Sequence, residues 1–238
     1  MAKVKRGSKL AETLAKAILT RISSEGMAIG SQLPSESQMQ AEYGVGRGSL
    51  REALRILEVH GIISLKAGIG GGPVVEGATT SDFGRMATVF FQASSVSFRE
   101  VIDARLELEP MLAGLAADCC DPAQTQDLLD ARTSTRNDEA YLRTSAGFHR
   151  QVAAMSGNRI LSLVSHALED IFHERVVGLL FPPEKRADVV KAHAAIAEAI
   201  AAGDRNTAEQ LMRDHMVEYV QYVEERYPAL MDEVVTWQ

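Results

Sequence analysis

Apolar residues recur at helical spacing through most of the sequence from residue 82 to the C-terminus. Two segments show this clearly, because 189–200 and 211–222 each place apolar side chains on one face of a helix. No segment of this part alternates apolar and polar residues as a strand does. Short breaks divide it at residues 94–97, 121–122, 133–137, 157, 181–183 and 203–204. This stretch is therefore predicted to form an all-α antiparallel bundle of about seven helices.

The first 60 residues follow a different pattern, with three short helices and tight breaks between them. The first helix should end near Gly26, and an apolar residue marks every fourth position on it: Leu10, Leu14, Ile18 and Ile22. Ser35 is the expected N-cap of the second helix, with Glu36 in its first turn and Gly44 at its end. The third helix is expected from about Gly48 to His60, with a buried stripe of Leu50, Ala53, Leu54 and Leu57.

Two short apolar runs, 62–63 and 73–75, follow the third helix and are separated by a glycine-rich tip. This arrangement favours a small β-hairpin. Three helices and a hairpin make a winged helix-turn-helix, so the whole chain is predicted to be mainly α. The small and polar residues that follow show no periodicity and indicate a linker. The predicted organisation is one domain over 1–76, a linker over 77–81 and a second domain over 82–230.

Charge is distributed unevenly along the chain. The net charge of the whole sequence is −7, but residues 1–75 hold ten Lys and Arg against six Asp and Glu, a net charge of +4, and the remainder carries −11. A basic head on an acidic body is expected where only one domain meets phosphate, although chance variation of the surface would give the same pattern.

The sequence offers no sign of a membrane or secreted protein. No apolar run approaches the roughly 18 residues that cross a bilayer, and the polar start lacks the apolar segment of a signal peptide. The expected location is the cytoplasm. The adjacent Cys119 and Cys120 match neither zinc nor redox motifs and are interpreted as buried small hydrophobic residues.

Two arginines mark one side of the predicted third helix. Arg47 lies at its entrance and Arg51 one turn further along, while Leu50 and Leu54 face the core. In a helix-turn-helix this helix enters the major groove of DNA. Arginine binds guanine through two hydrogen bonds, or binds a phosphate. A single arginine on a helix is more often a solvated charge, so spacing alone leaves both interpretations open.

The run from Leu33 to Ile63, LPSESQMQAEYGVGRGSLREALRILEVHGII, resembles the DNA-binding domain of the GntR family of bacterial regulators. The resemblance covers about residues 8–75. It implies a role in binding double-stranded operator DNA for these residues: Arg47, Ser49, Arg51, Gly68, Glu36, Gly48 and Lys66. The sequence departs from the family pattern at Ser37, where an arginine is usual, and at Gly48, where a hydroxyl residue is usual. These departures point to an altered preference for the half-site.

Three histidines, His149, His193 and His215, lie on separate predicted helices with apolar neighbours. If they converge inside the bundle, they would bind a divalent ion such as zinc. For any single histidine, a hydrogen-bonded role in the core is the commoner case. The spacing does not show convergence.

The stretches 101–117 and 148–158, together with His193 and His215, resemble the FCD ligand-binding domain of the FadR-type branch of this family. In that branch an aspartate and three histidines hold a metal ion, and a carboxylate effector completes the coordination with help from an arginine. The resemblance assigns His149, His193 and His215 to the metal, and Arg105 to the effector. Ser145 stands where the aspartate is usual, so metal binding is expected to be weaker, to use water, or to be absent. Arg105 could instead form a surface ion pair with Glu109 at i,i+4.

The favoured hypothesis is a homodimeric transcription regulator, not an enzyme. Its winged domain would bind a palindromic operator, and its helical domain would bind a small organic acid at Arg105, Ser145 and the three histidines. One alternative is a metal-dependent enzyme that uses the three histidines, although no general base accompanies them. Another is a protein-interaction module with a degenerate winged helix, which Ser37 and Gly48 favour slightly.

Overall fold

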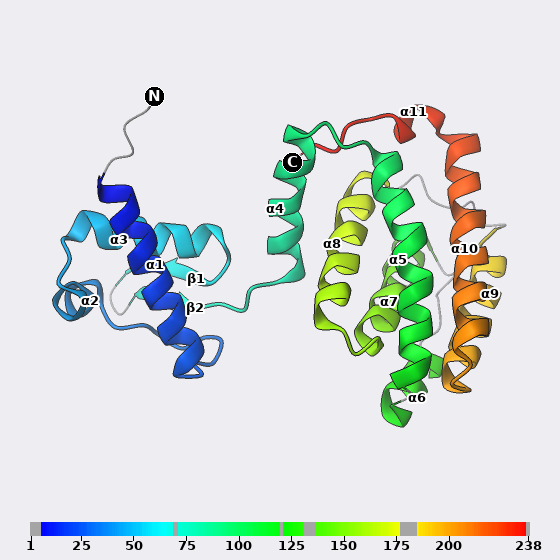
Figure 1. The fold of residues 1–238 in the computed structure, drawn as a ribbon, viewed down its shortest axis with the longest axis horizontal. Helices are drawn as coiled ribbons and strands as arrows, with labels where there is room; N and C mark the ends of the chain where they lie inside the picture. The colour runs from blue at the N-terminus through cyan, green and yellow to red at the C-terminus, as the bar shows by residue number, and fades with distance from the viewer. Residues whose placement is uncertain (1–5, 69–70, 120, 131–136, 177–184, 237–238) are drawn as a thin grey trace. The chain divides into compact units, whose positions relative to one another are not determined.

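The computed structural model describes residues 6–68, 71–119, 121–130, 137–176 and 185–236. Cys120 and the predicted breaks at 133–136 and 181–183 lie outside these residues. The chain divides into two compact units, 1–83 and 84–238, and each is described separately. Both are built mainly from helices, as predicted, and the described strands form one two-stranded sheet in the first unit (Figure 1).

The first unit is the predicted winged helix-turn-helix. Its helices and strands are α1 (Arg6–Ser24), α2 (Glu36–Tyr43), α3 (Arg47–Val59), β1 (Ile63–Lys66) and β2 (Gly72–Val75). The strands pair antiparallel, with Ile63 opposite Val75 and Lys66 opposite Gly72. The hairpin is therefore the predicted wing, with Lys66 and Gly72 as the last strand pair before its glycine-rich tip.

Local signals fix the helix boundaries of this unit. Ser35 caps α2, and the backbone N–H of Ser35 donates in return to the side chain of Gln38 at 2.9 Å, which completes a capping box. Gly44 ends α2 in the left-handed conformation, with φ 63°, as a residue without a Cβ does readily. The turn to α3 is consequently short.

The core of the first unit confirms most of the predicted stripes. All four predicted core residues of α3 are buried. On α1 one prediction is wrong, because Leu10 is 45% exposed and the neighbouring Ala11 is buried instead. Four residues rotate a helix by about 40° more than one full turn. Leu10 lies three such steps before Ile22, so the excess rotation accumulates and moves Leu10 off the buried face. The buried face of α1 thus shifts by one residue at its N-terminal end.

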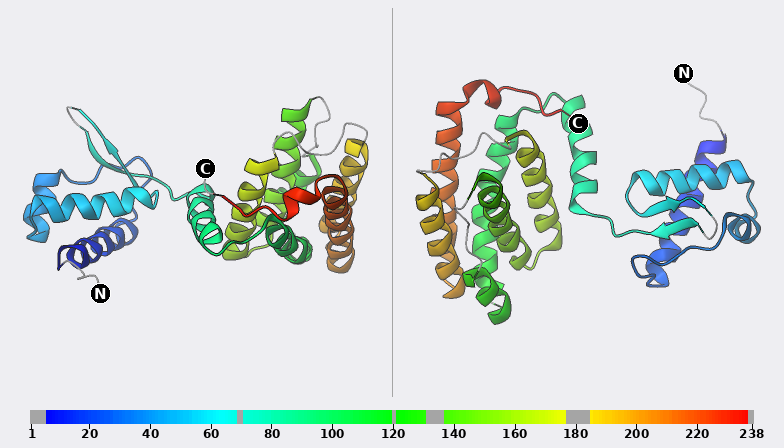
Figure 2. Two further views of the ribbon diagram at one scale, coloured as in Figure 1. Left: turned by 90° about the horizontal axis from the view of Figure 1, so that it is seen from above. Right: turned by 180° about the vertical axis from the view of Figure 1, so that it is seen from behind.

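The second unit is a bundle of antiparallel helices. Its helices are α4 (Thr80–Ala93, which begins in the first unit), α5 (Phe98–Cys119), α6 (Pro122–Asp130), α7 (Asp138–Met155), α8 (Arg159–Val176), α9 (Arg186–Ala201), α10 (Arg205–Arg226) and α11 (Pro228–Met231). Helix α5 packs along α10 and also contacts α7, α8 and α9. Figure 2 shows α9 and α10 side by side from two further directions. Helix α5 is therefore the central element of the bundle.

The structure extends two of the predicted elements. Thr79 and Asp82 form reciprocal hydrogen bonds that cap α4, so this helix begins at Thr80 within the predicted linker. At the other end, Val235 is 1% exposed and its N–H donates to the carbonyl of Val96 at 2.9 Å. The packed chain consequently continues past residue 230.

Two hydrophobic clusters fill the bundle, and α5 contributes to both. Phe98, Val101 and Ile102 belong to one cluster, and Ala113 and Ala116 belong to the other. Between these positions α5 buries two charged residues, which are described below. In the described part of the chain, every helix is too short or too polar to span a bilayer.

Candidate functional site

The exposed side of α3 carries the arginines that the sequence singled out. Arg47 keeps 72% of its side chain exposed, and Gly48 and Arg51 are exposed as well. Ser49 is half-buried at the first turn of the helix. Because Leu50 and Leu54 are buried on the opposite side, both guanidinium groups extend into solvent from the N-terminal half of α3.

The remaining residues that the sequence assigned to DNA lie on α2 and the wing. The carboxylate of Glu36 on α2 lies 4.0 Å from Nε of Arg47, so a long ion pair links it to an arginine of the next helix. Lys66 is exposed at the end of β1. Gly68 is exposed at the wing with φ 102°, a conformation that L side chains rarely adopt. Helix α2, helix α3 and the wing thus supply all seven predicted residues within one unit.

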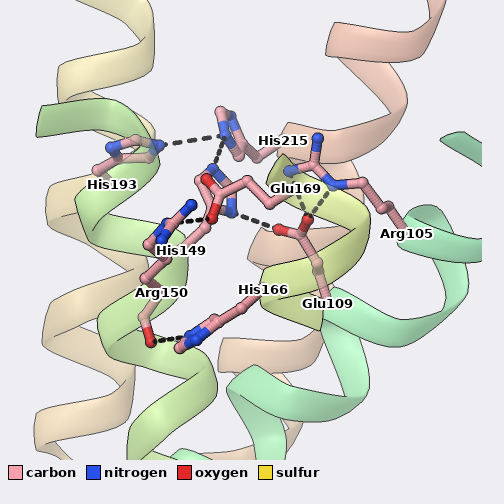
Figure 3. A network of polar contacts seen from close by, with 8 residues as sticks. All are labelled: Arg105, Glu109, His149, Arg150, His166, Glu169, His193 and His215. Atoms are coloured by element: carbon pink, nitrogen blue, oxygen red, sulfur yellow. Dashed lines mark hydrogen bonds and ion pairs between the residues drawn. The ribbon is translucent and has the colours of Figure 1, made fainter. Parts of the chain in front are cut away.

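In the second unit the three predicted histidines converge. Nε2 of His193 lies 3.2 Å from Nε2 of His215, which lies 3.4 Å from Nε2 of His149. They come from α9, α10 and α7 respectively, and Figure 3 shows their rings pointing toward one another. All three are buried, at 4%, 8% and 9% exposure. The ring of Phe148 stacks on His193 with centroids 4.0 Å apart and covers one side of the cluster.

Burial keeps two of these imidazoles neutral. Desolvation lowers the pKa of His193 well below its ordinary value, and the neighbouring histidines lower it further. Desolvation likewise lowers the pKa of His215, to about 3. A neutral imidazole has one unprotonated ring nitrogen, which can bind a cation.

The three nitrogens fit the donor set of a divalent metal. Zinc binds histidine nitrogen at about 2.0–2.1 Å, so two donors on a tetrahedral ion lie about 3.3 Å apart. The separations of 3.2 and 3.4 Å agree with this value. The ligand atoms all lie within 4.8 Å of one another, so they form one group of donors.

A buried ion pair on α5 lies against the histidine cluster. Arg105 is 6% exposed and Glu109 is 3% exposed. Nε and Nη2 of Arg105 donate to Oε1 of Glu109 at 2.7 and 2.6 Å. Oε2 of Glu109 contacts Nδ1 of His149. The interpretation of Arg105 and Glu109 as a surface pair is therefore wrong, because α5 is enclosed on several sides by other helices.

The charge on Glu109 is stabilised by these two partners. Burial opposes ionisation, but Arg105 and His149 outweigh it and hold the pKa of Glu109 below its ordinary value. A second buried carboxylate, Glu169 on α8, has its pKa raised by desolvation. It accepts a hydrogen bond from Nε of Arg150 at 2.9 Å, and the charges of Arg105 and Arg150 both favour its ionised form.

Ser145 lies on α7 one turn before His149 and is half-buried. Its side chain is hydrogen bonded to Tyr141, whose pKa is raised to about 12 by burial. The guanidinium of Arg186 lies 4.8 Å from the centre of the Tyr141 ring. Ser145 therefore offers a hydroxyl at this end of α7, where a carboxylate would have offered an anionic ligand.

The low pKa of His215 predicts a pH-dependent stability of the metal-free protein. An unfolded histidine titrates near pH 6.5, whereas His215 stays neutral in the fold down to about pH 3. The unfolded chain therefore binds more protons in this window, and folding stability is lost as the pH falls below 6.5. Denaturant unfolding in a chelator should show a loss of about 2 kcal/mol between pH 7 and pH 5 from this residue. H215N should show a shallower pH dependence, and parallel profiles would contradict the assignment.

Sequence reasoning missed the role of Glu109 and the pairing of Glu169 with Arg150. The spacing of Arg105 and Glu109 indicated a pair, and its position on an apolar helix was a sign that the pair is buried. Nothing in the sequence placed Glu109 against His149, because these residues lie on different helices.

Two family descriptions match the sequence. "Bacterial regulatory proteins, gntR family" matches residues 10–71, and "FCD domain" matches residues 100–218. The first match covers the helices and wing of the first unit. The second covers α5 to α10, and so includes the buried ion pair and all three histidines.

Several curated proteins are similar over most of the chain. The HTH-type transcriptional repressor NanR of Enterobacter sp. (strain 638) is 28% identical over 217 residues, which span 87% of this chain and 83% of that protein. A putative L-lactate dehydrogenase operon regulatory protein of Escherichia coli (strain K12) is 26% identical over 87% of this chain and 84% of its own length. Among solved structures, Streptococcus agalactiae GntR aligns with a TM-score of 0.69 at 21% identity, covering 89% of this chain and 99% of that one, which supports the fold.

Proposed function

Because the chain belongs to the gntR family of bacterial regulatory proteins and carries an FCD domain, we propose that it is an operator-binding regulator whose affinity for DNA is set by an organic acid bound beside the histidine cluster. The family makes it a DNA-binding transcription regulator with an effector-binding domain, and the metal-dependent enzyme is set aside. The observation that carries the ligand part is the convergence of three buried histidines beside a buried arginine.

For DNA binding, we assign residues 1–76 as the reading domain. Arg47 and Arg51 bind base edges or phosphates in the major groove, and Ser49 and Gly48 lie close to the DNA at the first turn of α3. Glu36 orients Arg47 from α2. Lys66 and Gly68 bring the wing to the phosphate backbone, where a cation and a close backbone approach are both favourable.

For effector binding, we assign the helical domain, which was predicted over residues 82–230 and which extends from Thr80 to Val235 in the structure. His149, His193 and His215 would hold a divalent metal such as zinc, which supplies a Lewis acid centre for an anionic ligand. Three neutral ligands leave the charge of such a centre uncompensated, and Ser145 adds no negative charge. A carboxylate effector compensates that charge, and Arg105 attracts the same anion.

The regulatory step follows from differential binding. We propose a homodimer, joined through the helical domains, that presents two reading domains to the two halves of a palindromic operator. A ligand changes operator affinity only if it binds more tightly to one arrangement of the reading domains. Typical coupling of 1–3 kcal/mol corresponds to a change in affinity of about 5- to 150-fold.

The test is selection of bound fragments from the organism's own genomic DNA, followed by footprinting with and without a panel of small organic acids. We expect enriched fragments that share a sequence with dyad symmetry, and an acid that changes their affinity by at least about fivefold. Failure to distinguish any fragment from random DNA would refute the operator. Binding that no acid changes would refute control by an organic acid.

A further inference from the structure

The two carboxylate oxygens of Glu109 contact two residues to which the proposed function gives different roles. Its Oε1 holds Arg105 through two nitrogens, and its Oε2 contacts His149. Figure 3 shows the three side chains in a row, with Glu109 between the arginine and the histidines. The proposed function gives Arg105 and the histidines separate tasks, and it assigns none to Glu109.

The contact with His149 determines which nitrogen of that ring carries a proton. Oε2 of Glu109 and Nδ1 of His149 face each other closely, although the contact lacks the alignment of a hydrogen bond. Because a carboxylate oxygen can only accept, we infer that the proton of the neutral ring lies on Nδ1. In the neutral ring the proton on Nδ1 leaves Nε2 without one. Nε2 is the atom that lies 3.4 Å from Nε2 of His215. Glu109 therefore presents the free lone pair of His149 to the cluster.

The contact with Arg105 keeps Glu109 in the ionised form that this role requires. A carboxylate that is 3% exposed would bind a proton if it had no cation beside it. The guanidinium supplies that cation at 2.6 and 2.7 Å. Only two of its three nitrogens take part in the pair, and the third points away from Glu109 in Figure 3.

We propose that Glu109 is a positioning residue that sets the metal affinity of the histidine cluster, and that Arg105 acts on this affinity through Glu109. The inference rests on the proposed metal site of the three histidines. A carboxylate on the far nitrogen of a ligating histidine fixes its orientation and raises its basicity, and loss of such a partner typically weakens metal binding by about 10- to 100-fold.

The experiment measures Co²⁺ and Zn²⁺ binding to the purified full-length protein and its variants. E109Q keeps the size of the side chain and removes its charge. We expect Co²⁺ affinity to fall about 10- to 100-fold, with a shifted visible spectrum of the bound Co²⁺. E107Q is the matched control, because Glu107 lies on the same helix with 75% of its side chain exposed. It should bind Co²⁺ as the unaltered protein does.

Two further variants, R105Q and R105Q/E109Q, test whether Arg105 acts on His149 through Glu109. R105Q leaves Glu109 buried without its cation, so Co²⁺ affinity should fall as it does in E109Q. If Arg105 acts through Glu109, then R105Q/E109Q should bind Co²⁺ no more weakly than E109Q alone. This double variant also removes both buried charges, so it can be studied if a single variant does not fold.

Nitrogen NMR of the metal-free protein gives a readout that stability does not affect. We expect His149 to be protonated on Nδ1 in the unaltered protein, and both tautomers to be populated in E109Q. An E109Q affinity within twofold of the unaltered protein would overturn the role of Glu109 and leave the metal site in place. If the loss of Co²⁺ affinity in R105Q/E109Q equals the product of the losses in R105Q and E109Q, the action of Arg105 through Glu109 is overturned. Absence of metal binding by the unaltered protein would overturn both the metal site and this inference, without affecting operator binding.

Discussion

Reversal of charge at Arg47 and Arg51 is expected to abolish operator binding. Both guanidinium groups extend from the exposed side of α3, and neither side chain contributes to the buried core of the first unit. An arginine that contacts a base through two hydrogen bonds contributes about 1–3 kcal/mol. R47E/R51E also introduces two charges that phosphate repels, so affinity should fall by at least about 100-fold. Electrophoretic mobility shift at fixed salt measures this loss.

The control for net charge is K191E/R226E, which makes the same change on exposed residues of the helical unit. It should reduce operator affinity only slightly, because both residues lie outside the proposed reading domain and salt screens charges that do not contact phosphate. The far-ultraviolet circular dichroism of R47E/R51E should match that of the unaltered protein. Equal losses in the two double variants would show that α3 does not form the interface.

Loss of His193 is expected to remove high-affinity metal binding. His193 supplies one of three donors, and its Nε2 lies 3.2 Å from that of His215. The two remaining histidines form a weaker site, so H193A should reduce Zn²⁺ affinity by at least about 100-fold. This loss should exceed that of E109Q, because Glu109 contacts a ligating histidine and not the metal. Added Zn²⁺ should raise the thermal midpoint of the unaltered protein and leave that of H193A nearly unchanged.

His166 provides the matched control for this experiment. It lies in the same unit, and its Nε2 is 3.0 Å from the carbonyl oxygen of Arg150, outside the group of three donors. H166A should therefore keep the Zn²⁺ affinity and the thermal shift of the unaltered protein. If H166A and H193A lose metal binding equally, the metal lies elsewhere or both changes disturb the bundle.

Much of the first unit could be predicted from the sequence because its signals are local. Ser35 and Gly44 mark the ends of α2 by chemistry that acts within a few residues, and both ends are found where expected. The buried residues of α3 follow from helical spacing alone. Leu10 differs because a fixed spacing of four residues drifts around a helix. The start of α4 differs because Thr79 and Asp82 cap a helix inside a stretch of small and polar residues that indicated a linker.

The sequence by itself determined the winged helix-turn-helix, both ends of α2, the helical character of the second unit, and which side of α3 carries its arginines. Only the tertiary structure decided that Nε2 of His215 lies within hydrogen-bonding distance of Nε2 of His193 and of His149, which are 22 and 66 residues away in the sequence. It also decided that Glu109 lies between Arg105 and His149. The physical reason is that helical period and capping act along one segment. The packing of the whole bundle determines which faces of separate helices meet. The site forms only there, because its side chains come from different helices.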